Sequence, residues 1–173
     1  MKEGRYKSYG AYLPYRERLF EYTGVIIPLI FAGIFILIPI IFGIPSTLKI
    51  AFFCGGALWL IVFSPINYFL SAKDVRFYLD EISIDKSINV CYVKYYDKDI
   101  LKKEQIALED LQIKLETIYS RGGGYKVCIY NNKNQITFQL CGVEYWSKEI
   151  CEEIVKTYTQ IRKENLKQDK NIK

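Results

Sequence analysis

Thiols and carboxylates are the side chains most able to do chemistry in this chain, because the sequence contains no histidine. Five cysteines are present, but no Cys-x-x-Cys pair occurs and no histidine is available to complete a zinc site. The same absence excludes nucleophilic arrangements of the Ser-His-Asp and Cys-His types. We therefore expect buried free thiols in a reducing compartment, and no metal or other cofactor.

Neighbouring carboxylates are the second group that could act as acid, base or metal ligand. Lysines surround these pairs, which fall where solvated turns or helix faces are expected. Residues 122–124 are glycines, but they lack the Gly-Lys-Ser/Thr ending of a Walker-type phosphate loop. We therefore interpret the chain as non-enzymatic, with no catalytic residues. The pairs are Asp80/Glu81, Asp97/Asp99, Glu109/Asp110 and Glu152/Glu153.

Several cations are candidates for contact with anions. Those that flank the apolar part of the chain are Arg16, Arg18, Lys73 and Arg76. They are expected to meet the negative surface of a membrane, although the same charges also serve as an insertion signal that needs no later function. Arg121 is a separate candidate, because the glycines beside it allow successive backbone amides to converge on an anion. As part of a hairpin turn, that segment needs no ligand.

Two apolar runs free of charged residues, 25–42 and 50–70, dominate the N-terminal half. Each provides roughly 20 residues, enough to cross a hydrocarbon core of about 30 Å at about 1.5 Å per residue. The short connector 43–47 makes the two helices antiparallel neighbours. Residues 23–70 are therefore predicted to form a two-helix transmembrane hairpin. A removable signal peptide does not fit, because an arm precedes the first run and a second span follows it.

Lysine and arginine lie mostly outside the hairpin, in the arm and directly after the second run. This bias predicts an integral protein of the cytoplasmic (inner) membrane with both termini in the cytoplasm. The arm, residues 1–22, has tyrosines at 6, 9, 12 and 15, which we interpret as an aromatic belt at the interface. Stacking of these rings on bases is the alternative. The net charge of +5 is spread along the chain, so no nucleic-acid partner is expected.

From Asp74 onward the hydrophobic period changes to two, which is typical of strands. A break in the phase at Asp80 predicts a bulge or turn. Polar or glycine-rich segments at 85–87, 120–124 and 131–134 predict hairpin turns. The expected strands are 75–79, 81–85, 88–96, 105–108, 111–118, 125–129 and 136–140.

The chain then ends in one amphipathic helix. Ser147 is the expected N-cap, and Arg162 with Lys163 suits the helix end. The apolar stripe is predicted to be buried, and residues 166–173 are read as a basic tail. The stripe contains Ile150, Cys151, Ile154, Val155, Tyr158 and Ile161.

This order of elements resembles the bacterial pleckstrin-homology-like domains of small membrane proteins. The resemblance covers residues 71–165, and residues 103–111 are similar to a connection that is common in those domains. It implies a PH-like β-barrel or sandwich of about seven antiparallel strands capped by a C-terminal α-helix. It also implies a non-catalytic interaction module. The basic phosphoinositide-binding motif of some eukaryotic members is not matched.

Two functions of different classes follow from this layout. The first is a membrane-anchored binding or scaffold protein, whose cytoplasmic β domain contacts lipid headgroups, a protein partner or further copies of itself. The alternative resembles the membrane effectors of cyclic-oligonucleotide antiphage signalling, in which the β domain senses the ligand and the hairpin disrupts the membrane. A neighbouring gene for a nucleotide cyclase would favour the alternative. Co-purification of a protein without added nucleotide would favour the first.

Overall fold

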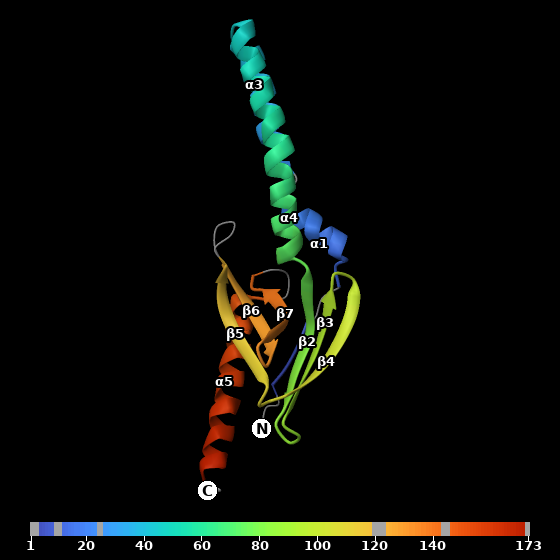
Figure 1. Cartoon of the computed structure of the whole chain (residues 1–173), viewed down its shortest axis with the longest axis vertical. Helices are drawn as coiled ribbons and strands as arrows, with labels where there is room; N and C mark the ends of the chain where they lie inside the picture. The colour runs from blue at the N-terminus through green and yellow to red at the C-terminus, as the bar shows by residue number, and fades with distance from the viewer. Residues whose placement is uncertain (1–3, 9–11, 24–25, 119–123, 143–145, 172–173) are drawn as a thin grey trace. The chain divides into compact units, whose positions relative to one another are not determined.

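The structure, a computed structural model, describes residues 4–8, 12–23, 26–118, 124–142 and 146–171. The chain divides into two compact units (Figure 1). The helical unit is Leu13–Arg76, and the β unit combines Met1–Tyr12 with Phe77–Lys173. The arm expected over residues 1–22 is therefore split, because its first part pairs with a sheet and its second part is helical.

The helical unit contains the apolar helices predicted from sequence. Its elements are α1 (Tyr15–Thr23), α2 (Ile26–Ile41), α3 (Ser46–Leu58), the π-helical segment η1 (Trp59–Phe63) and α4 (Ser64–Asp74). The last three run on without interruption as one helix, Ser46–Asp74. Pro65 lies two residues after the end of η1, and its missing N–H together with its ring accounts for the local widening to the π form.

Antiparallel packing joins α2 and α3. The ring of Phe31 lies 5.4 Å from that of Trp59, whereas the ring of Phe35, further along α2, lies 6.2 Å from that of Phe52. A Cβ added to Gly56 would lie 3.1 Å from the Cβ of Phe35, so glycine is what allows this close approach. The predicted antiparallel arrangement of the two apolar helices is confirmed.

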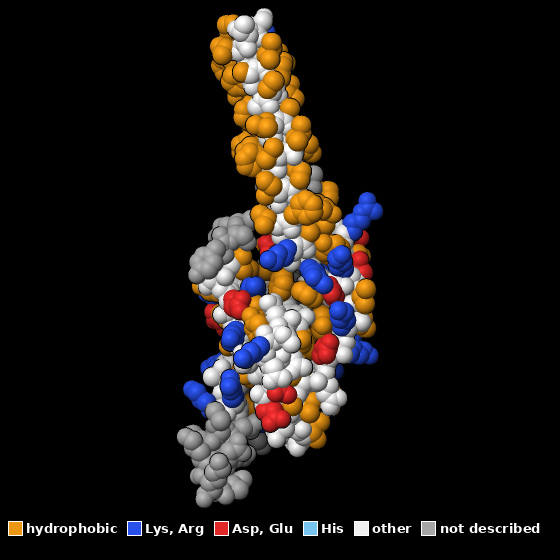
Figure 2. Space-filling model, in the orientation of Figure 1, with side chains coloured by type: hydrophobic (Ala, Val, Ile, Leu, Met, Phe, Trp, Pro, Cys, Tyr) orange, Lys and Arg blue, Asp and Glu red, His pale blue; other side chains and the backbone are white. Residues whose placement is uncertain are grey.

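The two apolar helices differ in length. Ser46–Asp74 has 29 residues and is long and apolar enough to cross a membrane, the one such helix among the described residues. By contrast, α2 has only 16 residues. Hydrophobic side chains cover the visible surface of the long helix (Figure 2). The structure thus supports one spanning helix by length and composition, and a span by α2 stays a prediction.

The β unit consists of two antiparallel sheets and a terminal helix (Figure 1). One sheet has the order β1-β2-β3-β4 and the other β5-β6-β7. The sheets are open, so the closed-barrel form of the prediction is not what the chain adopts. The strands are β1 (Gly4–Lys7), β2 (Phe77–Asp85), β3 (Val90–Asp97), β4 (Ile100–Ala107), β5 (Leu111–Ile118), β6 (Gly124–Asn131) and β7 (Asn134–Leu140).

The described residues form seven strands, but not quite the seven that were expected. The segments predicted at 75–79 and 81–85 merge into the single strand β2, which begins only at Phe77 and whose register shifts between Leu79 and Glu81. The predicted phase break is therefore a β-bulge. The remaining strand is β1, which pairs with β2 from Gly4 opposite Ile84 to Lys7 opposite Glu81.

The hydrophobic core lies between the two sheets and α5 (Lys148–Asn171). The predicted N-cap is confirmed, since the backbone N–H of Ile150 donates to Ser147 Oγ at 3.3 Å. The stripe on α5 is buried at Cys151, Ile154, Tyr158 and Ile161. Part of the expected tail, residues 166–171, continues the helix. The terminal helix therefore packs as predicted but is longer.

Candidate functional site: a groove along α1, α2 and α4

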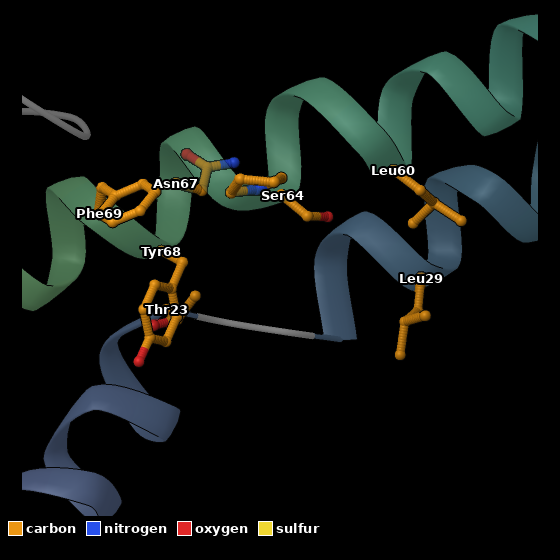
Figure 3. A pocket seen from close by; sticks show the side chains of 8 residues that line it. Thr23, Leu29, Leu60, Ser64, Asn67, Tyr68 and Phe69 are labelled. Carbon is orange, nitrogen blue, oxygen red and sulfur yellow. The ribbon is translucent and has the colours of Figure 1, made fainter.

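Two adjoining cavities open on the helical unit. The first has a volume of about 500 Å³, and its lining residues include Thr23, Leu29, Leu60, Ser64, Asn67, Tyr68 and Phe69 (Figure 3). The second has a volume of about 740 Å³ and is lined by Arg16, Glu17, Leu19, Phe20, Glu21, Thr23 and Tyr68. Both are lined by Thr23 and Tyr68, so they are neighbours, and we call the two together the α1 groove.

The α1 groove changes in polarity along its length. Leu29 of α2 and Leu60 of η1 lie together at one end, away from Thr23 and Tyr68 (Figure 3). The hydroxyl of Thr23 donates to the backbone carbonyl of Leu19, one turn earlier in α1. Beyond this hydroxyl-lined middle, the groove is lined by charged side chains of α1. The α1 groove therefore has three parts, which we name by their lining residues. They are the apolar slot (Leu29 and Leu60), the polar neck (Thr23 and Tyr68) and the charged mouth (Arg16, Glu17 and Glu21).

Arg18 holds α1 in place beside the end of α4. Its Nε donates to the carbonyl of Leu13 at 3.0 Å, and its Nη1 donates to the carbonyl of Val75 at 2.9 Å. The side chain is only 5% exposed. Charge-assisted bonds of this kind stabilise more strongly than neutral ones. They satisfy one carbonyl just before α1 and one at the C-cap of α4. The hydroxyl of Tyr15 adds a 3.3 Å bond to the carbonyl of Ala72.

This role corrects the expectation for Arg18. It was grouped with the cations that meet a lipid headgroup, but its guanidinium is buried and donates to backbone carbonyls. The order of residues does not by itself reveal this difference, because Arg16 and Arg18 both flank Glu17 in the same short segment. Burial depends on which face of α1 packs against α4.

The other expected cations lie in different positions. Arg16 is exposed and lines the charged mouth of the α1 groove, while Lys73 and Arg76 are exposed near the end of α4. Arg121 lies outside the described residues. Sequence reasoning missed Glu17 and Glu21, which line the mouth together with Arg16. Their four-residue spacing was the available signal, because residues four apart share a helix face.

Members of three of the four carboxylate pairs, Asp80/Glu81, Asp97/Asp99 and Glu152/Glu153, form ion pairs in the β unit. Asp80 contacts Lys94 at 2.5 Å, and this hydrogen bond is the main reason that the pKa of Lys94 is raised. Asp97 contacts Lys102 at 3.2 Å. Within the part of the chain that the structure describes, no group of three or more Cys, Asp or Glu side chains is arranged to hold a metal ion.

No protein-family model matches the chain, and no curated protein matches its sequence.

Proposed function

We propose that this chain is a non-catalytic, membrane-anchored binding protein whose helical unit lies in the bilayer and holds a phospholipid in the α1 groove. One observation carries the proposal: the helix Ser46–Asp74 exposes large apolar side chains along its length. Keeping apolar surface in water costs about 25 cal/mol for each Å². A continuous apolar surface of this kind marks a membrane or protein interface.

Charged residues flank the apolar part of the long helix and suggest how that helix is positioned in the bilayer. Lys49 and Lys73 are separated by residues 50–72, which carry no charged side chain. That stretch measures about 35 Å at the rise of an α-helix, close to the hydrocarbon thickness of about 30 Å. Lys73 then belongs at one headgroup layer. Because α1 packs beside the same end of the helix, the charged mouth of the groove belongs to that layer too.

Exposed aromatic residues support this placement of α1. Phe20 on α1 is 63% exposed, and Tyr68 on α4 is 50% exposed. The amphipathic ring of Tyr68 favours the boundary between hydrocarbon and headgroups, and the apolar ring of Phe20 favours the hydrocarbon beside it. The belt that was expected over the whole arm is therefore proposed for α1 and α4 only. The tyrosine at position 12 packs instead on Tyr96 of the β unit, with ring centroids 3.9 Å apart.

The charged mouth favours a headgroup that carries both signs. Arg16 offers a cation to a phosphate, whereas Glu17 and Glu21 offer carboxylates to an ammonium group. The apolar slot at Leu29 and Leu60 accommodates part of an acyl chain. A zwitterionic phospholipid with a primary ammonium matches all three parts of the groove. Lys73 and Arg76 stay candidates for contact with anionic lipids in the same leaflet.

The β unit is proposed to be the cytoplasmic module that binds a protein partner. Its seven antiparallel strands in two sheets and its C-terminal helix support a pleckstrin-homology-like assignment. The excess of Lys and Arg outside the apolar helices supports a cytoplasmic location for both termini. The α1 groove and the β unit would then give the protein one lipid-binding and one protein-binding part.

The lipid proposal is tested with the full chain in nanodiscs that contain phosphatidylethanolamine, phosphatidylcholine and phosphatidylglycerol in equal amounts. Native mass spectrometry then identifies the lipids that stay bound after release from the disc. We expect enrichment of phosphatidylethanolamine, and its loss in the Glu17→Gln/Glu21→Gln variant. The matched control is Lys49→Ala, which removes a cation at the opposite end of the long helix. Equal retention of the three lipids by the wild-type chain would contradict the proposal.

A further inference from the structure

Cys141 and Cys151 bring two thiols together where β7 ends and α5 begins. Backbone hydrogen bonds fix the chain at Cys141 and at Gly142, the residue after it. The N–H of Cys141 donates to the carbonyl of Tyr125 at 2.8 Å, and the N–H of Gly142 donates to the carbonyl of Trp146 at 2.7 Å. The thiol of Cys151 lies 3.9 Å from that same carbonyl. Both sulfurs therefore sit on backbone that the sheet and the helix hold in place.

The two cysteines meet at one backbone carbonyl, because both the N–H of Gly142, next to Cys141, and the thiol of Cys151 reach the carbonyl of Trp146. The surroundings of the two thiols differ. Cys151 is 0% exposed, whereas Cys141 is half-buried and so can be reached from solvent. The hydrogen bond from the Cys151 thiol lowers the pKa of Cys141. The same bond, and then burial, raise the pKa of Cys151. The accessible sulfur is thus the one that more readily becomes a thiolate, which is the nucleophilic form.

We infer that Cys141 and Cys151 form an oxidisable pair that closes an intramolecular disulfide when the chain meets a hydroperoxide. The thiolate of Cys141 attacks the peroxide oxygen, which breaks the O–O bond, gives a sulfenic acid and releases water or an alcohol. The sulfur of Cys151 then displaces hydroxide from the sulfenic sulfur, and its proton leaves with that hydroxide as water. The two sulfurs are oxidised together by two electrons, and the peroxide is reduced.

The remaining cysteines lack this combination of contact and access. Cys91 and Cys128 are buried, and burial raises the pKa of each thiol to about 12. Cys54 is exposed, but it belongs to the apolar helix Ser46–Asp74. The chemistry therefore selects one pair out of five cysteines.

Closing the bond would fasten the first turn of α5 to the end of β7. The helix packs on β1, β5 and β6 and contributes Ile154 and Tyr158 to the core. A covalent link between its start and the adjacent sheet restricts the unfolded chain and so favours the docked helix. In a reducing compartment the pair would rest as thiols. Peroxide would then make the docking of α5 harder to reverse.

The test uses the reduced full chain in mild detergent, treated with hydrogen peroxide. Intact and peptide mass spectrometry measure the products, so the result does not depend on the folding of a variant. We expect the wild-type chain to lose two hydrogens and to yield one peptide pair linked through Cys141 and Cys151, which dithiothreitol reverses. Oxidation at Cys91 should be at least about tenfold slower.

Two variants resolve the order of the steps. In Cys151→Ser, dimedone should trap a sulfenic acid at Cys141. In Cys141→Ser, neither the disulfide nor a sulfenic acid at Cys151 should form on the same time scale. The inference is overturned if wild-type Cys141 is oxidised to sulfinic acid while Cys151 stays a thiol. It is equally overturned if neither residue reacts faster than Cys91.

Discussion

The indole Nε1–H of Trp146 donates a 2.8 Å hydrogen bond to the backbone carbonyl of Leu79, a residue 67 positions earlier in the chain. The N–H of Leu79 is also bound by a side chain, because it donates to Gln139 Oε1 at 2.9 Å. Leu79 stands at the bulge of β2, where the register of the ladder shifts. Trp146 and Gln139 thus satisfy both backbone groups of a buried residue at the point where β2 approaches β7.

Trp146→Phe should destabilise the β unit, because it keeps most of the ring but leaves the buried carbonyl of Leu79 without its donor. We expect a loss of about 1–3 kcal/mol. Hydrogen exchange of the β2 amides, measured by mass spectrometry on the full chain in detergent, reports this loss as faster opening. Trp59→Phe in the helical unit is the matched control and should leave β2 exchange unchanged. Unchanged exchange in Trp146→Phe would refute the prediction.

The bulge shows which part of this arrangement the sequence could predict. The alternation of apolar and polar residues breaks at Asp80, and that local signal was sufficient to place an irregularity in the strand. The partners of Leu79 are non-local. Nothing in the pattern around Trp146 or Gln139 indicates that either side chain reaches a backbone group in another sheet.

Removal of residues 1–8 should destabilise the β unit, because it strips β1 from the edge of β2. The hydroxyls of Tyr6 and Thr157 also form a 2.8 Å hydrogen bond that ties β1 to α5. We expect faster exchange at Glu81 to Ile84 and in the middle of α5. Lys7→Ala changes only an exposed side chain of the same strand and serves as control. A truncated chain that exchanges like the wild type would show that β1 adds nothing to stability.

The strand β1 was missed for a physical reason. It has only four residues, Gly4–Lys7, and two of them are charged, so it carries no measurable alternation. Its stability comes from pairing with β2 about 75 residues later and from contact with α5, both of which are tertiary. Domain boundaries drawn from the apolar runs alone could not assign it to the β unit.

Ile154→Ala should cost about 2–5 kcal/mol, because Ile154 is 0% exposed at the centre of the buried stripe of α5. Denaturant unfolding of the full chain, followed by the fluorescence of buried Trp146, measures this change. Lys156→Ala lies on the exposed face of the same helix and should change stability little. A loss below about 0.5 kcal/mol for Ile154→Ala would mean that α5 is not docked in solution.

The hydrogen bond between Tyr130 and Glu116 should make stability depend on pH. The Tyr130 hydroxyl donates to Glu116 Oε1 at 2.5 Å, and this bond is the main reason that the pKa of Glu116 lies below its ordinary 4.5. A lowered carboxyl pKa adds stability that is fully present above the unfolded value and is lost as the pH falls through the folded value. The contribution should therefore persist at neutral pH and vanish in acid.

Tyr130→Phe removes that bond and provides the measurement. The difference in unfolding free energy between the wild-type chain and the variant should be constant above about pH 5 and should shrink below about pH 4. Urea unfolding followed by circular dichroism at several pH values gives this difference. Ser83→Ala, on the other sheet, is the control. A difference that grows in acid would have the wrong sign.

The candidate site was predictable only in outline. The apolar runs indicated where a membrane would lie, and the flanking cations indicated which residues would meet its surface. The sequence could not show that Arg18 turns inward to the carbonyl of Val75, since a long side chain reaches different partners from one backbone position. Nor could it pair Cys141 with Cys151, because their ten-residue spacing matches no motif.

The central claim is that the helical unit crosses the bilayer as a hairpin with both of its ends on the cytoplasmic side. Topology reporters test it most directly, with alkaline phosphatase or a fluorescent protein fused after Tyr22, after Ser46 or after Lys173. The account predicts fluorescence but no phosphatase activity for the fusions at Tyr22 and Lys173, and phosphatase activity alone for the fusion at Ser46. An active phosphatase at Lys173 would contradict the account, because the β unit would then lie outside the cytoplasm.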